Sequence, residues 1–293
     1  MPGADPSAKI RRDPVSAQSQ SYIIRGGLAG RERLRILSRV MRPTSLALLE
    51  RAGLRAGMQV LEIGSGGGDL AFDIARVVGP GGRVLGTDID QTKLNLAASE
   101  ARELNLANVD FELANISESA PRRTFDLVHT RFVLTHLADP KLALKHIRAA
   151  LNPGGIVVLE DIEFRGYFCH PDCAALWRYV DLYTETTRRR GVDANIGPRL
   201  PSLLAEAGFE KIRMNVVQPA GIEGEVKLIS PLTMENIAEA VIAEGLAGAE
   251  EIAGIVAELY AYARTPGTLG CMPRIFEAWA AQPAWRTAQM TLE

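Results

Sequence analysis

The segment 60–71 restricts the fold of this chain more than any other stretch. An apolar run that ends at Ile63 leads directly into a turn with glycine at positions 64, 66, 67 and 68. Beyond the turn, apolar residues repeat with the period of an amphipathic helix, namely Leu70, Ile74, Val77 and Val78. Glycine permits positive φ and lets a ligand approach the backbone closely. The following helix presents free N–H groups to the same place. The segment therefore predicts a strand, a turn and a helix that together bind a polar ligand.

The turn departs from the dinucleotide-binding fingerprint G-x-G-x-x-G. Gly64 and Gly66 match the first two glycines, but Asp69 occupies the third position. Glu62 adds a second carboxylate just before the turn. Two acidic groups disfavour a pyrophosphate and favour a ligand with positive charge. The pattern E-x-G-x-G-x-G after a first strand resembles motif I of the class I (Rossmann-like) S-adenosylmethionine-dependent methyltransferases, whose cofactor carries an ammonium and a sulfonium group.

The next predicted strand, 83–88, ends in another acid. Asp88 follows Gly64 by 24 residues, about where a ribose-binding carboxylate belongs. NAD-dependent enzymes also bind the ribose through such a carboxylate. Only the combination of Asp88 with Glu62 and Asp69 therefore favours S-adenosylmethionine over NAD as the cofactor. The resemblance implies that the first cofactor contacts are Glu62, Gly64, Ser65, Gly66, Asp69, Asp88 and Ile89.

Composition excludes several classes of function. The chain has 293 residues, of which 47% are hydrophobic and 23% charged, as in ordinary globular proteins. The net charge is −2 and the sequence has no long basic run, so we expect no nucleic-acid surface. The short cluster 188–190 precedes Gly191 and is typical of a helix C-terminus. No apolar run approaches 18 residues, so we expect no membrane partner.

Cysteine usage indicates a reducing compartment. The chain has 3 cysteines, which form no disulfide framework, and the N-terminus lacks a signal-peptide core. We therefore expect a cytoplasmic protein. Cys169, His170 and Cys173 lie close in sequence, but a fourth ligand is missing and the spacing fits no standard zinc site. No metal is expected.

The N-terminal region divides into two parts. Residues 1–20 are rich in Pro, Ser, Gln and Ala and are expected to be disordered. Residues 21–54 have helical periodicity, which Pro43 is expected to break into two helices. In the resembled family such a helical cap lies over the cofactor. Four residues of the cap would then lie near the methionine end of the cofactor or near the acceptor. Alternatively, they have only a packing role. These residues are Tyr22, Gly26, Gly27 and Arg33.

Residues 55–219 alternate predicted strands and helices. After the first strand, further strands are expected at 83–88, 109–113, 125–131, 156–161 and 209–217. Short loops between alternating elements favour a parallel sheet with right-handed crossovers, and ligands bind at the carboxyl ends of its strands. We therefore predict an α/β fold: a doubly wound, mostly parallel seven-stranded sheet with helices on both faces. One edge would gather Gly64, Asp88, Asn115, Thr130, Arg131, Glu160 and Asp161.

The segment 220–266 is expected to be a helical insertion before the last strand. Two helical patterns span 232–245 and 249–264, and the last strand is expected at 272–279 within a C-terminal part, 267–293. In the resembled family the last two strands form a close antiparallel pair. The apolar face of the second helix is expected to look toward the crevice or the sheet. The insertion would build an acceptor lid, or else serve a structural or dimer contact.

Further cofactor contacts follow from the resemblance. Asn115 stands where the family commonly has an acid that reads the adenine amino group, and its side-chain oxygen can accept the same bond. Ile116 would cover the adenine ring. Thr130 and Arg131 end the strand that resembles motif IV, whose residues face the methyl donor.

Catalysis is expected to depend mainly on orientation, because the methyl donor is already activated. A base helps only if the nucleophile arrives protonated. His136 is the preferred candidate base and Asp161 an alternative, while His129 is expected to be a hydrogen-bonded core residue. Arg131 would fix an acceptor anion or the methionine carboxylate, or would pair with Asp161.

The sequence therefore predicts methyl transfer from S-adenosylmethionine to the O, N or C atom of a small-molecule acceptor. The motifs Y-x-x-x-G-G and R-E-R-L look most like enzymes of natural-product and quinone pathways. Two other hypotheses stay open: a nicotinamide-dependent oxidoreductase, and a non-catalytic binding protein with the same fold. A monomer or a homodimer is expected.

Overall fold

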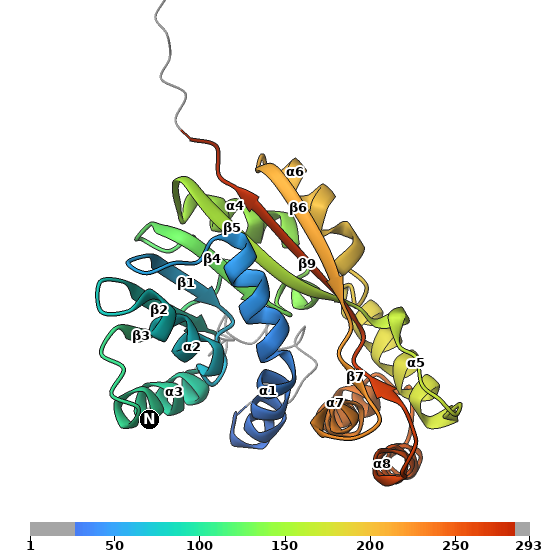
Figure 1. Ribbon diagram of the computed structural model, residues 1–293. Helices are drawn as coiled ribbons and strands as arrows, with labels where there is room; N and C mark the ends of the chain where they lie inside the picture. The colour runs from blue at the N-terminus through green and yellow to red at the C-terminus, as the bar shows by residue number, and fades with distance from the viewer. Residues whose placement is uncertain (1–26, 285–293) are drawn as a thin grey trace, which may run out of the picture.

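A seven-stranded sheet forms the centre of the molecule (Figure 1). The computed structural model describes residues 27–284, so the segment 1–20, Tyr22 and Gly26 lie outside the described part. Across the sheet the order is β3-β2-β1-β4-β5-β9-β6. The strands are β1 (Gln59–Ile63), β2 (Arg83–Asp88), β3 (Val109–Leu113), β4 (Phe125–Arg131), β5 (Leu151–Glu163), β6 (Glu210–Val217) and β9 (Arg274–Ala281). The first five pair in parallel, whereas β9 is antiparallel to both β5 and β6. The predicted fold class is confirmed.

The order of the strands determines where a ligand can bind. From β1 the chain moves outward to β2 and β3, then returns to place β4 on the other side of β1. Loops after β1 and β4 therefore leave the sheet in opposite directions. The crevice between them, at the carboxyl ends of the strands, is the usual ligand site of such sheets.

Helices cover both faces of the sheet. On one face, α1 (Gly27–Ala52), α2 (Asp69–Val78) and α3 (Gln91–Glu103) share a core in which Leu49, Ile74 and Val158 are fully buried. On the other face, α4 (Pro140–Ala149) and α6 (Leu200–Glu206) pack over Leu159. These two cores hold the strands rigidly, and with them the loops at their ends.

Helix α1 is continuous, so the predicted break at Pro43 is wrong. Pro43 lies inside the helix and its side chain is exposed. A proline in a helix interior costs about 3 kcal/mol or more. Burial on both sides offsets this cost, because Met41 precedes the proline, Leu48 follows it, and both are fully buried. Figure 1 shows α1 running from the sheet to a position beside α7.

The segment between β6 and β9 forms a helical layer at the carboxyl side of the sheet. It contains the pair β7 (Ala220–Gly221) and β8 (Gly270–Cys271), and the helices α7 (Ile229–Ala243) and α8 (Ala249–Arg264). With α5 (Ala174–Arg189) and the first half of α1, these helices enclose a third core.

The apolar face of α8 does not have the predicted direction. Ile252, Ile255 and Leu259 are buried in the third core, where α8 packs against α5 and α7. The face is therefore directed at neighbouring helices and not at the crevice or the sheet. A helix so far from the sheet can bury its apolar stripe only against other helices.

Candidate functional site

The glycine turn after β1 has a backbone that only glycine adopts easily. Gly64, Gly66 and Gly68 have φ angles of 72°, 55° and 84°. A Cβ atom on Gly64 would lie 2.5 Å from Cγ2 of Val133, and one on Gly68 would lie 2.8 Å from Cζ of Phe111. Both conformation and space thus require glycine here.

Asp88 holds the glycine turn and the next loop together. Gly66 donates its N–H to Oδ2 of Asp88 at 3.0 Å, and Asp90 donates its N–H to Oδ1 at 3.0 Å. Each carboxylate oxygen can accept a further bond. The carboxylate is therefore fixed at the end of β2 with capacity left for two hydroxyl donors.

A cavity of about 700 Å³ lies at the carboxyl ends of the strands. Most of the site residues that the sequence predicts line this cavity, although they are far apart along the chain. These lining residues are Glu62, Gly64, Ser65, Gly66, Asp69, Asp88, Ile89, Asn115, Ile116, Arg131 and His136. Thr130 and Asp161 are not among the lining residues, and Tyr22 lies outside the described part of the chain.

Glu62 is the most unusual group on the cavity wall. Its side chain is buried, and Oε2 has no hydrogen-bond partner among the described residues. Burial raises the pKa of Glu62 to about 8, although the positive charge of Arg131 opposes the shift. Burial also raises the pKa of Asp69, which lines the same cavity. Two desolvated carboxyl groups beside a glycine turn fit a cationic ligand such as the ammonium and sulfonium of S-adenosylmethionine.

Asp161 does not line the cavity, because its carboxylate is turned toward backbone N–H groups. Its carboxylate accepts the N–H of Thr135 at 3.1 Å and that of Ile162 at 2.9 Å. Burial raises the pKa of Asp161 to about 7. The structure thus places Asp161 behind the loop after β4, where it holds the segment that carries His136.

His136 lies on the cavity wall in a short 3-10 turn, Leu134–His136. Burial, followed by the positive charges of Arg33 and Lys93, lowers the pKa of His136 to about 3. The imidazole is therefore neutral at pH 7 and a weak base. His129 is the hydrogen-bonded core residue that we predicted, since its Nε2 lies 2.9 Å from Oε1 of Glu160.

Arg131 is held by α1 and β5. Its Nη1 donates to Oγ of Ser45 at 3.0 Å, and Ser45 donates to Oε2 of Glu160 at 2.9 Å. Within residues 30–284, Arg131 forms no ion pair with Asp161, so that alternative is wrong. The guanidinium is thus fixed beside the cavity that it lines.

The chain resembles known methyltransferases in sequence. A family model described as a methyltransferase domain matches residues 54–185. The ubiquinone/menaquinone biosynthesis C-methyltransferase UbiE of Klebsiella pneumoniae is 30% identical over 193 residues, which cover 60% of this chain and 70% of that protein. The chain belongs to the class I S-adenosylmethionine-dependent methyltransferases. Its cofactor is therefore S-adenosylmethionine.

Two further comparisons define the extent of the similarity. UbiE of Psychromonas ingrahamii is 32% identical over 157 residues, which cover 53% of this chain and 56% of that protein. The chain spans about half the length of several such curated relatives. The crystal structure of the [4+2]-cyclase SpnF has a TM-score of 0.52 at 24% identity and covers 83% of this chain and 81% of that one. This likeness supports the fold.

The loops after β2 and β3 add Ile89, Asn115 and Ile116 to the wall of the cavity. Asn115 accepts the N–H of Ser117 at 3.0 Å through Oδ1, and its Nδ2 donates to Oε1 of Glu118 at 3.0 Å. The carbonyl of Ile116 accepts from Nδ1 of His146 at 2.6 Å. Ile116 is buried, whereas Ile89 is 54% exposed. The loop after β3 is therefore held by its own hydrogen bonds and by His146 of α4.

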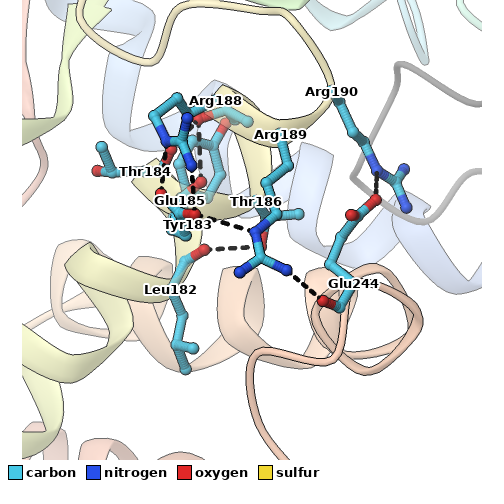
Figure 2. A network of polar contacts seen from close by, with 10 residues as sticks. Leu182, Tyr183, Thr184, Glu185, Thr186, Arg188, Arg189, Arg190 and Glu244 are labelled. Atoms are coloured by element: carbon cyan, nitrogen blue, oxygen red, sulfur yellow. Dashed lines mark hydrogen bonds and ion pairs between the residues drawn. The ribbon is translucent and has the colours of Figure 1, made fainter.

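Sequence reasoning missed several lining residues: Lys93, Ser117, Phe132, Arg189, Arg190 and Glu244. Figure 2 shows the last three. Arg190 donates through Nε to Oε1 of Glu244 at 3.1 Å, and Arg189 donates through Nη1 to the Glu244 carbonyl at 2.5 Å. The expected helix end at the basic cluster is correct, since α5 stops at Arg189. Nothing in the sequence of the basic cluster 188–190 indicates that its residues also line the cavity.

Residues 30–284 hold no group of three or more His, Cys, Asp or Glu side chains placed for a metal ion. Cys169, Cys173 and Cys271 are free thiols. Within the described part of the chain, every helix is too short or too polar to span a bilayer.

Proposed function

We propose that this protein transfers the methyl group of S-adenosylmethionine to a small-molecule acceptor by in-line SN2 displacement. The observation that carries the proposal is the buried Glu62 carboxyl group, which has an unpaired oxygen and lies on the wall of a 700 Å³ cavity beside the glycine turn. A buried carboxyl group of this kind is stabilised by a cation. When bound, the cofactor supplies an activated methyl group on a sulfonium.

Each group of lining residues has a proposed role toward the cofactor. The Asp88 carboxylate accepts the ribose hydroxyls, while Asn115 contacts the adenine amino group between Ile89 and Ile116. Glu62 and Asp69 face the positively charged methionine end. The backbone of the glycine turn contributes through Gly64, Ser65 and Gly66. Tyr22 remains a proposed contact, and Thr130 supports the wall from the strand position opposite Ile63.

The chain contributes orientation more than acid–base chemistry. His136 is neutral, lines the cavity and can accept a hydrogen bond from the nucleophile. Arg131 is fixed by Ser45 and can hold the acceptor in place. Asp161 positions the loop of His136 and does not touch the acceptor. Holding two reactants in line can contribute about 7–11 kcal/mol to catalysis.

The acceptor class follows from the cavity and from the relatives. A cavity of about 700 Å³ has room for a cofactor and a small acceptor. The relatives' names assign them to ubiquinone and menaquinone biosynthesis, so we propose an acceptor from quinone or other secondary metabolism. The free thiols favour a reducing compartment, and we propose the cytoplasm.

A second function also has an observation in its favour. SpnF, whose solved structure resembles this fold, is called a [4+2]-cyclase, so the fold alone does not determine the reaction. The chain could therefore bind S-adenosylmethionine without transferring its methyl group. The nicotinamide hypothesis has lost its basis, because the chain belongs to the methyltransferases.

Methyl-labelled S-adenosylmethionine distinguishes these functions. With a panel of quinols, phenols and amines, we expect label in an organic product and an equal amount of S-adenosylhomocysteine. Asp88→Asn should weaken cofactor binding more than tenfold, because hydrogen bonds to a charged group contribute about 1.5–3 kcal/mol each. Asp110→Asn, at an exposed carboxylate paired with Arg83, is the matched control. Cofactor binding without label transfer to any acceptor would favour the non-methylating function.

A further inference from the structure

Arg33 is a buried cation that pairs with no anionic side chain among residues 30–284. It lies on α1, and only 8% of it is exposed. Its Nε donates to Oγ1 of Thr233 at 3.0 Å, while the Thr233 hydroxyl donates to the carbonyl of Ile229 at 2.7 Å. Within residues 30–284, no carboxylate forms an ion pair with Arg33. Since buried charges are normally paired, an anion is missing from its surroundings.

Arg33 lies at the junction of two cavities. It lines the main cavity and also a smaller one of about 40 Å³. Leu37, Phe132 and His136 line both cavities as well. The residues of the glycine turn line only the main cavity. The smaller cavity therefore extends away from the cofactor, on the side where an acceptor would lie.

The wall of the smaller cavity is aromatic. It includes Phe164, Tyr167, Tyr179 and Tyr183. The rings of Phe164 and Tyr183 are stacked, with centroids 3.8 Å apart and planes 7° apart. Burial raises the pKa values of Tyr167 and Tyr179, so both hydroxyls are neutral. These side chains therefore supply no negative charge to Arg33.

The charges around the cavity are unevenly distributed. Three of the lining acids, Glu62, Asp69 and Asp88, belong to the proposed cofactor side, and the fourth, Glu244, is paired with Arg190. Among the remaining lining cations, Arg189 pairs with Glu185, whereas Arg131 donates to the Ser45 hydroxyl and pairs with no carboxylate within residues 30–284. An anionic acceptor would be attracted to this side.

A second arginine, Arg31, lies beside the glycine turn, where the methionine end of the cofactor is proposed to bind. A Cβ atom on Gly67 would lie 3.0 Å from Nη1 of Arg31, so Arg31 adjoins the glycine turn. That Nη1 atom is buried and has no hydrogen-bond partner among the described residues. Although Nη2 of Arg31 pairs with Glu100, its Nη1 can donate to the carboxylate of the cofactor, and Arg33 can then bind another anion.

We propose that the acceptor is a small carboxylic acid with an aromatic or apolar body, and that Arg33 binds its carboxylate. The guanidinium is a donor matched in shape to a carboxylate, and Thr233 fixes its orientation. The apolar body lies in the main cavity, at its junction with the smaller one, because about 40 Å³ is too little for an aromatic ring. This inference rests on the proposed methyl transfer and specifies its acceptor.

Calorimetry on the protein loaded with S-adenosylhomocysteine tests the assignment. Benzoate, cinnamate and 2-naphthoate are each compared with the corresponding neutral amide. We expect at least one acid to bind more than tenfold more tightly than its amide. Arg33→Gln should remove that difference and leave the affinity for S-adenosylhomocysteine within twofold. Arg33→Lys, which retains the charge, should keep part of the preference for the acid.

Arg39→Gln is the matched control, because Arg39 is exposed on the same helix and pairs with Glu225. Equal binding of every acid and its amide by the wild-type protein would refute the proposal, whether or not the variants fold. A tenfold loss of S-adenosylhomocysteine affinity in Arg33→Gln would also refute it and would assign Arg33 to the cofactor. Failure of the wild-type protein to bind S-adenosylhomocysteine would instead refute the proposed function.

Discussion

The carboxyl group of Glu62 lies at the end of β1, where burial raises its pKa to about 8. A neutral carboxylic acid must lose its proton to bind a cation well. The cofactor is therefore expected to release a proton from the protein when it binds. The same shift affects folding, because the folded protein without cofactor retains a proton that the unfolded chain loses above its ordinary pKa of 4.5. Stability from this group is present below pH 4.5 and is lost as the pH rises toward 8.

We expect the affinity for S-adenosylhomocysteine to rise as the pH increases from about 6 to about 9. At about pH 9, Glu62→Gln should bind S-adenosylhomocysteine more weakly than the wild-type protein. Its affinity should also vary much less with pH, because the ionisable group is gone. Each unit of pKa shift corresponds to about 1.4 kcal/mol. Calorimetry in buffers of different ionisation enthalpy measures the proton released. Glu112→Gln, at an exposed position on β3, is the control. A wild-type affinity independent of pH would contradict a contact between Glu62 and the cofactor.

At the scale of the element, α1 connects the cavity to the sheet. Arg33, Leu34 and Leu37 on its first half line the cavity, whereas Leu48 and Leu49 on its last half are buried on the sheet. The residues of α1 that line the cavity keep a fixed position relative to the sheet only if the helix is continuous through Pro43.

Pro43→Ala is expected to stabilise the protein by about 2 kcal/mol. The substitution restores a helical N–H and removes a steric cost of about 3 kcal/mol, while the unfolded chain regains about 0.4–1 kcal/mol of entropy. Pro43 is exposed, so little packing is lost. Urea denaturation measures the change, with Glu50→Ala on the same helix as the control. Destabilisation would show that the packing of α1 depends on a bend at the proline.

Lys227 lies at the neck of the helical segment between β6 and β9, where the two ends of that segment meet. Its Nζ donates to the carbonyl of Ile222 at 3.1 Å, the carbonyl of Thr265 at 3.2 Å and Oγ1 of Thr268 at 2.7 Å. The side chain is buried in the turn Glu225–Leu228. One ammonium group thus joins the beginning of the segment to its end.

We expect Lys227→Met to lower the melting temperature by several degrees, because buried acceptors lose their donor at a cost of about 1–3 kcal/mol each. Lys227 does not line either cavity, so cofactor affinity should stay within twofold. Lys145→Met, at an exposed position on α4, should change neither property. A large loss of cofactor affinity with unchanged melting would show that the neck acts on the site and not on stability.

At the scale of the whole molecule, the cavity is enclosed by parts of both the sheet and the helical layer. Glycine-turn residues such as Gly64 come from the sheet, while Arg190 and Glu244 come from the ends of α5 and α7. A ligand that contacts both parts stabilises the folded protein and not the unfolded chain.

S-adenosylhomocysteine is therefore expected to raise the melting temperature, and NAD is not. At one hundred times its dissociation constant, a ligand adds about 2.7 kcal/mol to the free energy of unfolding. This should appear as a shift of several degrees in a thermal melt. Stabilisation by NAD, with no response to S-adenosylhomocysteine, would contradict the assignment of the cofactor.

The sequence by itself determined the elements of the fold and the glycine turn. Strands, helices and turns depend on local patterns: glycines that permit positive φ at Gly64 and Gly66, and apolar residues that repeat with a helical or a strand period. The rule that strands of a parallel sheet end at one edge then gathered Glu62, Asp88 and Asn115 from distant positions.

Only the tertiary structure decided which side chains face the cavity and which cover its acceptor side. Asp161 lies outside the cavity because its carboxylate accepts the N–H of Thr135, a contact between residues 26 positions apart. The continuity of α1 through Pro43 depends on burial at both of its ends, which no local pattern contains. Arg33 and Arg190 reach the cavity because α7 packs against both α1 and α5. Such packing depends on contacts between residues far apart in sequence, and a pattern of neighbouring residues cannot specify it.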